Sequence, residues 1–311
     1  MTLLYYSPSF LDHDTGDHPE NAGRLLPAAR QLHKASSHFD LSRPDWAAIS
    51  QERLLRVHAP QYIESVRELA ARGGGYLDPD TVVCPRSYDV ALLAAGAVCD
   101  AVERVVRGAD KQAFCLLRPP GHHALRAHTM GFCLFSNVAL GARLAIDELG
   151  LDRVLIVDWD VHHGNGTQEI FWEDPQVAFL SIHRYPFYPG TGAADERGGG
   201  RGLGATVNLP IAFGTPRREY LAAFTAAVER LADQMRPQLV FISAGFDAHR
   251  LDPIGSLQLE SDDFADLARV VRQIAAVHSQ GRIVSVLEGG YHPQALAESI
   301  EAHLHELNTT N

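Results

Sequence analysis

Short apolar runs alternate with amphipathic stretches along this chain of 311 residues. Continuous runs rich in β-branched residues are typical of buried strands, and apolar positions three and four residues apart are typical of helices. This criterion predicts strands at residues 3–6, 113–117, 154–157, 177–182, 206–209, 239–243 and 282–287. It predicts helices at residues 22–34, 51–58, 61–71, 88–106, 137–149, 217–235, 262–278 and 293–307.

Strands that alternate with helices predict a parallel sheet with helices on both faces. The continuous apolar strands fit such a sheet, because both of its faces are covered. No linker or change of composition divides the chain, so we expect one α/β domain over residues 1–311. Residues 77–85, with a proline near each end, are predicted to form a surface loop.

Polar clusters directly follow several of the predicted strands. They are RPPGHH at 118–123, DWDVHHGNG at 158–166, His183, AGFDAH at 244–249 and EGGYH at 288–292. In a parallel sheet the carboxyl ends of the strands lie along one edge, where such folds place their ligands. The sequence therefore predicts one site to which these clusters contribute together.

Asp160 and His162 are candidate metal ligands. If the strand continues, they share one face with Asp158, while His163 points to the other face. A carboxylate and a neutral imidazole both suit zinc, and a catalytic site needs one more protein ligand and an open position for water. Asp247, beside a glycine at another strand end, is the candidate third ligand. Taken alone, Asp160 and His162 are more typical of a polar loop than of a metal site, and Asp247 is more typical of a helix cap or turn.

Two adjacent histidines and a tyrosine are candidates for proton transfer and for stabilising negative charge. His122 and His123 follow Pro-Pro-Gly, and imidazole titrates near neutral pH. Asp158 and Asn165 are candidate partners that orient the two rings. Tyr291 follows two glycines that allow a close approach to a ligand, and its hydroxyl could donate to a developing oxyanion. The alternative is a packed tyrosine with its hydroxyl in water.

Composition narrows the classes of function. The net charge of -11, with scattered Lys and Arg, leaves no basic surface for nucleic acid. The first ten residues lack the features of a signal peptide, and no apolar run reaches the length of about 18 residues that a membrane span needs. We therefore expect a cytoplasmic protein without membrane contact. The four cysteines form no Cys-x-x-Cys pair, which favours reduced thiols.

Six ordered motifs together resemble the histone deacetylase family. They are RPPGHHA at 118–124, GFCLFSNVA at 131–139, DWDVHHGNGTQ at 158–168, YPGTG at 188–192, SAGFDAH at 243–249 and LEGGY at 287–291. This family includes bacterial histone-deacetylase-like amidohydrolases, acetoin utilisation proteins and acetylpolyamine amidohydrolases. The resemblance implies the arginase/deacetylase fold, with an eight-stranded parallel sheet between helices, and zinc-dependent hydrolysis of N-acyl amides.

The resemblance also implies roles for single residues. Asp160, His162 and Asp247 resemble the family's zinc ligands, which leads us to expect one zinc ion per chain. Tyr291 resembles the tyrosine that stabilises the transition state, a position where some family members have histidine. Its presence favours an active enzyme.

The tandem histidines resemble the family's proton-transfer pair. His122 resembles the first histidine, paired with Asp158, and His123 resembles the general base, paired with Asn165. The partner of the general base is Asp in some branches and Asn in the branch that resembles class II enzymes. His123 is therefore expected to have a neutral partner here.

The substrate channel is also implied by resemblance. Phe132 and Tyr188 resemble the aromatic pair that lines the acyl-lysine tunnel, with Gly131 at its floor. Tyr188 departs from the more usual Phe, which makes the rim more polar. Polyamine-selective members tend to place an acidic residue where this chain has Ile254. We therefore expect an acylated lysine in a protein or peptide as the substrate, with a small acetylated amine such as a polyamine as the alternative.

A second ion is implied as well. Backbone carbonyls around Asp158, Asp160 and His162, together with Ser181, resemble the family's internal potassium site. We expect this potassium ion to be structural. An oligomer is compatible with the sequence, which does not specify one.

Two other classes of function stay open. An arginase-type ureohydrolase shares the fold but needs a second metal, and His249 stands where such enzymes resemble Asp-x-Asp. A non-catalytic binding or regulatory protein is the other alternative, and the complete set of candidate site residues argues against it.

Overall fold

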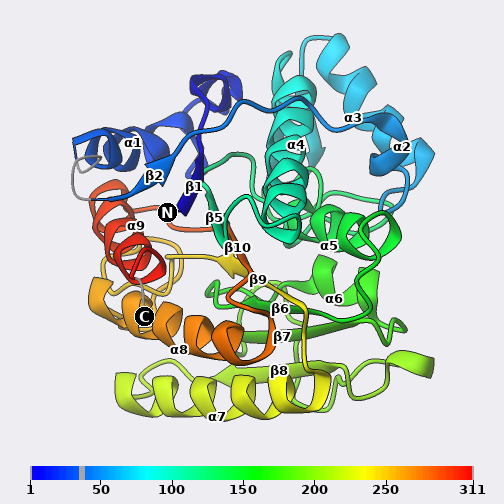
Figure 1. Cartoon of the computed structure of the whole chain (residues 1–311). Coiled ribbons are helices and arrows are strands. Elements are labelled where there is room, and N and C mark those ends of the chain that lie inside the picture. Colours follow the sequence, from blue (N-terminus) through cyan, green and yellow to red (C-terminus); the bar gives the residue numbers. More distant parts are fainter. Residues whose placement is uncertain (1, 35–38, 310–311) are drawn as a thin grey trace.

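An eight-stranded, all-parallel sheet forms the centre of the computed structural model, which describes residues 2–34 and 39–309 (Figure 1). Its spatial order is β2-β1-β5-β10-β9-β6-β7-β8. The strands are β1 Thr2–Tyr5, β2 Leu41–Ser42, β5 Gln112–Cys115, β6 Val154–Asp158, β7 Val177–Arg184, β8 Thr206–Ile211, β9 Leu239–Ala244 and β10 Ile283–Leu287. The expected fold class is confirmed. β2 was not predicted, because its two half-buried residues carry no apolar pattern.

Helices cover both faces of this sheet (Figure 1). One layer contains α1, α9, α8 and α7, each packed against the next, and the opposite layer contains α4 and α5. The α-helices are α1 Leu25–Lys34, α2 Gln51–Leu54, α3 Pro60–Ala71, α4 Ser87–Val106, α5 Asn137–Asp147, α6 Asn165–Phe171, α7 Arg217–Met235, α8 Ser261–His278 and α9 Pro293–Leu307. Short 3-10 helices lie at η1 Pro8–Asp12, η2 Ala22–Arg24 and η4 Gly200–Gly202.

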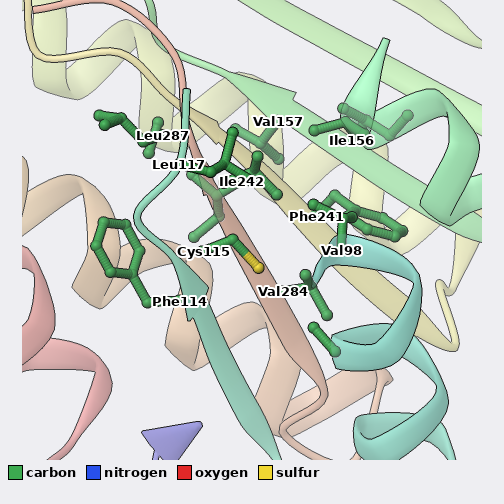
Figure 2. Packing of buried hydrophobic residues seen from close by; sticks show 14 of the residues in the cluster. Val98, Phe114, Cys115, Leu117, Ile156, Val157, Phe241, Ile242, Val284 and Leu287 are labelled. Carbon is green, nitrogen blue, oxygen red and sulfur yellow. The ribbon is translucent and has the colours of Figure 1, made fainter. Parts of the chain in front are cut away.

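The hydrophobic core lies between the sheet and these helices (Figure 2). Side chains of the central strands, such as Phe241 and Val284, are fully buried together with Val98 of α4. Gly141 lets α5 approach this layer, because a Cβ there would lie 2.9 Å from Val98 Cγ1 and 3.0 Å from Phe241 Cε1. A rigid, covered sheet of this kind fixes the positions of the loops at its edges. None of the described helices has the length and apolar content needed to cross a membrane.

Two local predictions were wrong. Residues 77–85 do not form a loop throughout, because β3 Gly75–Asp78 pairs antiparallel with β4 Thr81–Val83. Pro79 lies in the turn between these strands, where it removes no ladder hydrogen bond. The extended chain predicted beyond residue 157 ends at Asp158, and a bend then leads into α6. Strand alternation therefore does not determine where residues 159–164 point.

Candidate active site

The carboxyl ends of four adjacent strands bring the predicted polar clusters together. In the sheet, β5 lies beside β10, β10 beside β9, and β9 beside β6. Asp158 ends β6, Asp247 follows β9, and the turn with Tyr291 follows β10. The clusters meet because these central strands are parallel and end at the same edge.

Asp160, His162 and Asp247 form a compact buried group. Each residue offers one ligand atom, and these three atoms lie within 4.8 Å of one another. His162 Nδ1 lies 3.0 Å from Asp160 Oδ1 and 3.2 Å from Asp247 Oδ2. Burial and the negative charge of Asp160 raise the pKa of Asp247 to about 7, so the ionised form of Asp247 is disfavoured without a cation.

The free oxygen of Asp247 provides a test of whether a cation fits here. Asp247 Oδ1 accepts a hydrogen bond from the Val161 N–H at 2.8 Å, whereas Oδ2 is buried and accepts none from the described residues. A buried carboxylate oxygen without a donor is costly unless a cation binds it. Two carboxylates and one imidazole are a donor set that suits zinc. The residues therefore fit the metal that the sequence predicts.

Backbone contacts fix the two carboxylates. Asp160 Oδ2 accepts a hydrogen bond from the Gly289 N–H at 2.8 Å. A Cβ at Gly289 would lie 2.1 Å from Asp247 Oδ2, and one at Gly245 would lie 2.3 Å from Asp160 Oδ2. Only glycine allows the chain to pass so close to these oxygens. Side-chain orientation at the group is thus set by the turns after β9 and β10.

The tandem histidines have different partners and opposite protonation. His122 Nδ1 lies 2.9 Å from Asp158 Oδ2, and His123 Nδ1 lies 2.6 Å from Asn165 Oδ1. Burial acts to lower the pKa of His122, but the carboxylates of Asp160 and Asp158 outweigh it and raise the pKa to about 10. Burial and the charge of His122 hold the pKa of His123 well below its usual value. His122 is therefore charged and His123 neutral at pH 7.

The contact with Asn165 also selects the tautomer of His123. The Asn165 amide nitrogen donates to Met130 Sδ at 3.3 Å, which directs its oxygen toward His123 Nδ1. Because that oxygen can only accept, His123 Nδ1 carries the proton and Nε2 is left with a free lone pair. A neutral imidazole with a free nitrogen can act as a general base.

Tyr291 lies in the turn after β10, which contacts the carboxylate group through the N–H of Gly289. Burial raises the pKa of Tyr291 well above its usual value, so its phenol keeps its proton and can donate a hydrogen bond. The Arg24 guanidinium stacks over the Tyr291 ring at 4.6 Å. The same guanidinium donates to the carbonyls of Glu288 and Gly290, both at 2.7 Å. Arg24 therefore braces the turn that carries Tyr291.

The expected channel residues lie beside the tandem histidines and beside Tyr291. Tyr188 lies beside the histidines, 5.4 Å from the His123 ring, and Phe132 lies 5.8 Å from the Tyr291 ring. Gly131 packs under His123, since a Cβ there would lie 2.3 Å from His123 Cδ2. Tyr188 therefore lies beside the candidate general base and Phe132 beside Tyr291, and the role of these rings as channel walls stays a prediction.

Ser181, Ile254 and His163 lie outside the carboxylate group. Ser181 pairs with Asp158 across β7 and β6, and its Oγ lies 2.9 Å from His183 Nδ1. The potassium site at Asp158 and Ser181 stays a prediction. Ile254 is half-buried in the loop after Asp247. His163 contacts Thr191 Oγ1 at 2.7 Å and turns away from the carboxylate group, as expected.

Several residues that support the site were not predicted. Glu20 binds Arg118 and Arg24 through its carboxylate. Glu288 Oε2 accepts from the backbone N–H groups of Gly121 and His122, at 2.7 and 3.1 Å, and so holds the turn with the histidines. Glu288 belongs to the motif LEGGY at 287–291, which identified the position but not its role. Arg24 follows no local pattern that could have identified it.

The chain is similar to known deacetylases in sequence and in fold. The histone deacetylase domain family matches residues 18–307. The histone deacetylase-like amidohydrolase of Pseudomonas aeruginosa is 42% identical over 243 residues, covering 78% of this chain and 64% of the relative. The polyamine deacetylase HDAC10 of Homo sapiens is 41% identical over 293 residues, covering 90% of this chain and 43% of the relative. The crystal structure of the HDA15 HD domain has a TM-score of 0.93 at 36% identity, covering 98% of this chain and 87% of that one.

Proposed function

We propose that this chain, which belongs to the histone deacetylase family and is an amidohydrolase, removes acetyl or other acyl groups from lysine side chains of proteins or peptides. The observation that carries the chemistry is the buried Asp160–His162–Asp247 group, with one free carboxylate oxygen, close to a neutral histidine. The family implies a metal, typically zinc, and this group would hold it. When bound, zinc polarises the amide carbonyl and lowers the pKa of water from 15.7 toward about 7.

The chain's own residues supply the proton transfers. His123 takes a proton from the attacking water on its free Nε2, and Asn165 holds the ring through Nδ1. The Tyr291 hydroxyl donates a hydrogen bond to the oxygen that gains negative charge. The tandem histidines return a proton to the amine nitrogen as the carbon–nitrogen bond breaks. The products are a carboxylate and a free amine.

Tyr291→Phe tests this assignment. The variant should keep its zinc content and fold, because the ring still fits beside Arg24 and Phe132. Its kcat should fall about 10² to 10³-fold, as is typical when an oxyanion donor is removed. Zinc content, circular dichroism and turnover of a fluorogenic acetyl-lysine substrate measure the three properties. Full turnover would refute the role of Tyr291.

The choice of lysine as substrate depends on the loop with Ile254. An apolar side chain at this position offers no partner for a second ammonium group of the substrate. This supports an acyl-lysine substrate over a polyamine. Acetylpolyamine hydrolysis is the second candidate, favoured by the similarity to a relative named as a polyamine deacetylase.

One experiment separates the two substrates. An acetyl-lysine peptide and N-acetylputrescine are assayed side by side with the native chain and with Ile254→Glu. We expect the native chain to prefer the peptide in kcat/KM, and Ile254→Glu to shift the preference toward N-acetylputrescine, since a carboxylate can pair with its free ammonium group. A native preference for N-acetylputrescine would select the second candidate. Two bound manganese ions per chain would instead support a ureohydrolase.

A further inference from the structure

Asp252 connects two loops of the site through one buried carboxylate. Its side chain is 8% exposed and lies in the loop after Asp247. Asp252 Oδ1 accepts from the N–H groups of Ile254 at 2.9 Å and Gly255 at 3.0 Å, which is local loop geometry. Asp252 Oδ2 accepts from the Tyr291 N–H at 2.6 Å, across a separation of 39 residues. This last hydrogen bond joins the loop to the turn after β10.

The turn with Tyr291 has little conformational restraint of its own. Gly289 and Gly290 precede Tyr291, and Gly290 has a φ of +119°, a conformation that glycine alone adopts readily. Arg24 holds the carbonyl groups of this turn. Asp252 holds its other side, through the N–H group of Tyr291 itself. The direction in which the phenol leaves the backbone therefore depends on the Asp252 carboxylate.

The loop with Asp252 is in turn folded against the candidate metal ligand. The Asp247 carbonyl accepts from the Ser256 N–H at 2.7 Å. A Cβ at Gly255 would lie 2.5 Å from the same carbonyl oxygen. Asp252 therefore connects the loop that follows Asp247 to the turn that carries Tyr291.

We propose that Asp252 is a positioning residue, whose carboxylate sets the place of the Tyr291 phenol relative to Asp247. The inference rests on the proposed function of Tyr291. A small misplacement of a catalytic group costs up to about 10²-fold in rate. Outer partners of metal and catalytic residues typically contribute about 10 to 100-fold.

Asp252→Asn tests the proposal with little change of volume. Its amide oxygen can still accept from Ile254 and Gly255, but its NH₂ group then faces the Tyr291 N–H, so two donors oppose each other. We expect kcat on an acetyl-lysine peptide to fall about 10 to 100-fold with unchanged zinc content. KM should stay within about twofold, since the phenol acts in the transition state.

A double-mutant cycle with Tyr291→Phe separates positioning from general damage. If Asp252 acts through the phenol, Asp252→Asn should reduce kcat far less in the Tyr291→Phe background than in the native chain. Equal factors in both backgrounds, to within about twofold, would refute the proposal, as would an unchanged kcat of Asp252→Asn alone. A fully active Tyr291→Phe would instead refute the proposed function. The two failures are therefore distinguishable.

Two further variants complete the experiment. Asp174→Asn is the matched control, because Asp174 Oδ1 also accepts a loop N–H, from Gln176 at 2.8 Å, at the opposite edge of the sheet before β7. It should leave kcat unchanged. If Asp252→Asn does not fold, Asp252→Glu replaces it, since the added methylene moves the carboxylate away from the Tyr291 N–H. The same double-mutant criterion applies to Asp252→Glu.

Discussion

Two buried clusters of charged side chains lie near the carboxyl edge of the sheet, and they differ in whether their polar contacts are complete. The arginine cluster consists of Glu20, Arg24 and Arg118. Arg118 Nε and Nη2 contact the two Glu20 oxygens at 2.6 and 2.8 Å, and Arg24 Nη1 contacts Oε1 at 2.9 Å. The remaining hydrogen bonds of both guanidinium groups are to backbone carbonyls. Among the described residues, no buried side-chain atom of this cluster lacks a partner.

The carboxylate cluster consists of Asp160, His162 and Asp247, and it contains a buried oxygen without a donor. Its two acids face one imidazole, so with both acids ionised negative charge exceeds positive charge even when the ring is protonated. The arginine cluster needs no ligand, whereas the carboxylate cluster gains by binding a cation. The free oxygen of Asp247 therefore favours a binding site at the carboxylate cluster, whereas the arginine cluster, in the part of the chain that the structure describes, has no free side-chain group with which to bind a ligand.

The strongest test of this difference is Asp247→Asn. Asn keeps the oxygen that accepts from Val161 but removes the charge that a metal needs. We expect zinc binding to be lost and turnover to fall by at least about 10³-fold, because the attacking water loses its activation. The metal-free variant should unfold at the same urea concentration as the metal-free native chain, or at a higher one. Retained zinc and activity would contradict the assignment of Asp247.

Glu20→Gln should have the opposite effect on stability. It leaves two buried guanidinium groups without a counter-charge, and breaking a buried pair in this way typically costs about 3–5 kcal/mol. Urea unfolding of the metal-free proteins measures the difference. The control is Glu64→Gln on α3, where the pair of Glu64 with Arg67 is exposed and should contribute far less. If Glu20→Gln unfolds at the same urea concentration as the native chain, the charge of Glu20 does not stabilise the arginine cluster.

These two clusters also show how far the sequence alone could predict the site. The carboxylate cluster was predictable, because its members follow β6 and β9 and parallel strands place their ends at one edge. The face shared by Asp160 and His162 was predicted for the wrong reason, since the strand ends at Asp158 and a bend follows. The roles of the ligands still rest on resemblance and geometry together.

The arginine cluster was not predictable in the same way. Glu20 and Arg118 are separated by 98 residues, and nothing in the local pattern around either indicates the other. The hairpin at β3 and β4 was missed for a related reason, because prolines at residues 79 and 85 signal a turn without showing that strands flank it. Contacts between distant residues that follow no strand end depend on tertiary packing.

The smallest expected effect is the pH dependence of the arginine cluster. Burial by itself raises the pKa of Glu20, but Arg118 and Arg24 outweigh burial and hold that pKa well below its usual range. A glutamate in the unfolded chain has a pKa of about 4.3. The stabilisation from Glu20 is therefore complete above about pH 4.3 and is lost as the pH falls from there toward the folded-state pKa. Since Gln does not titrate, the gap in unfolding free energy between the native chain and Glu20→Gln should narrow by about 1.4 kcal/mol per pH unit below that point.

Urea titrations of both metal-free proteins between about pH 3 and 6 measure this gap. A gap that stays constant or widens in acid would show that Glu20 is not held as a charged group.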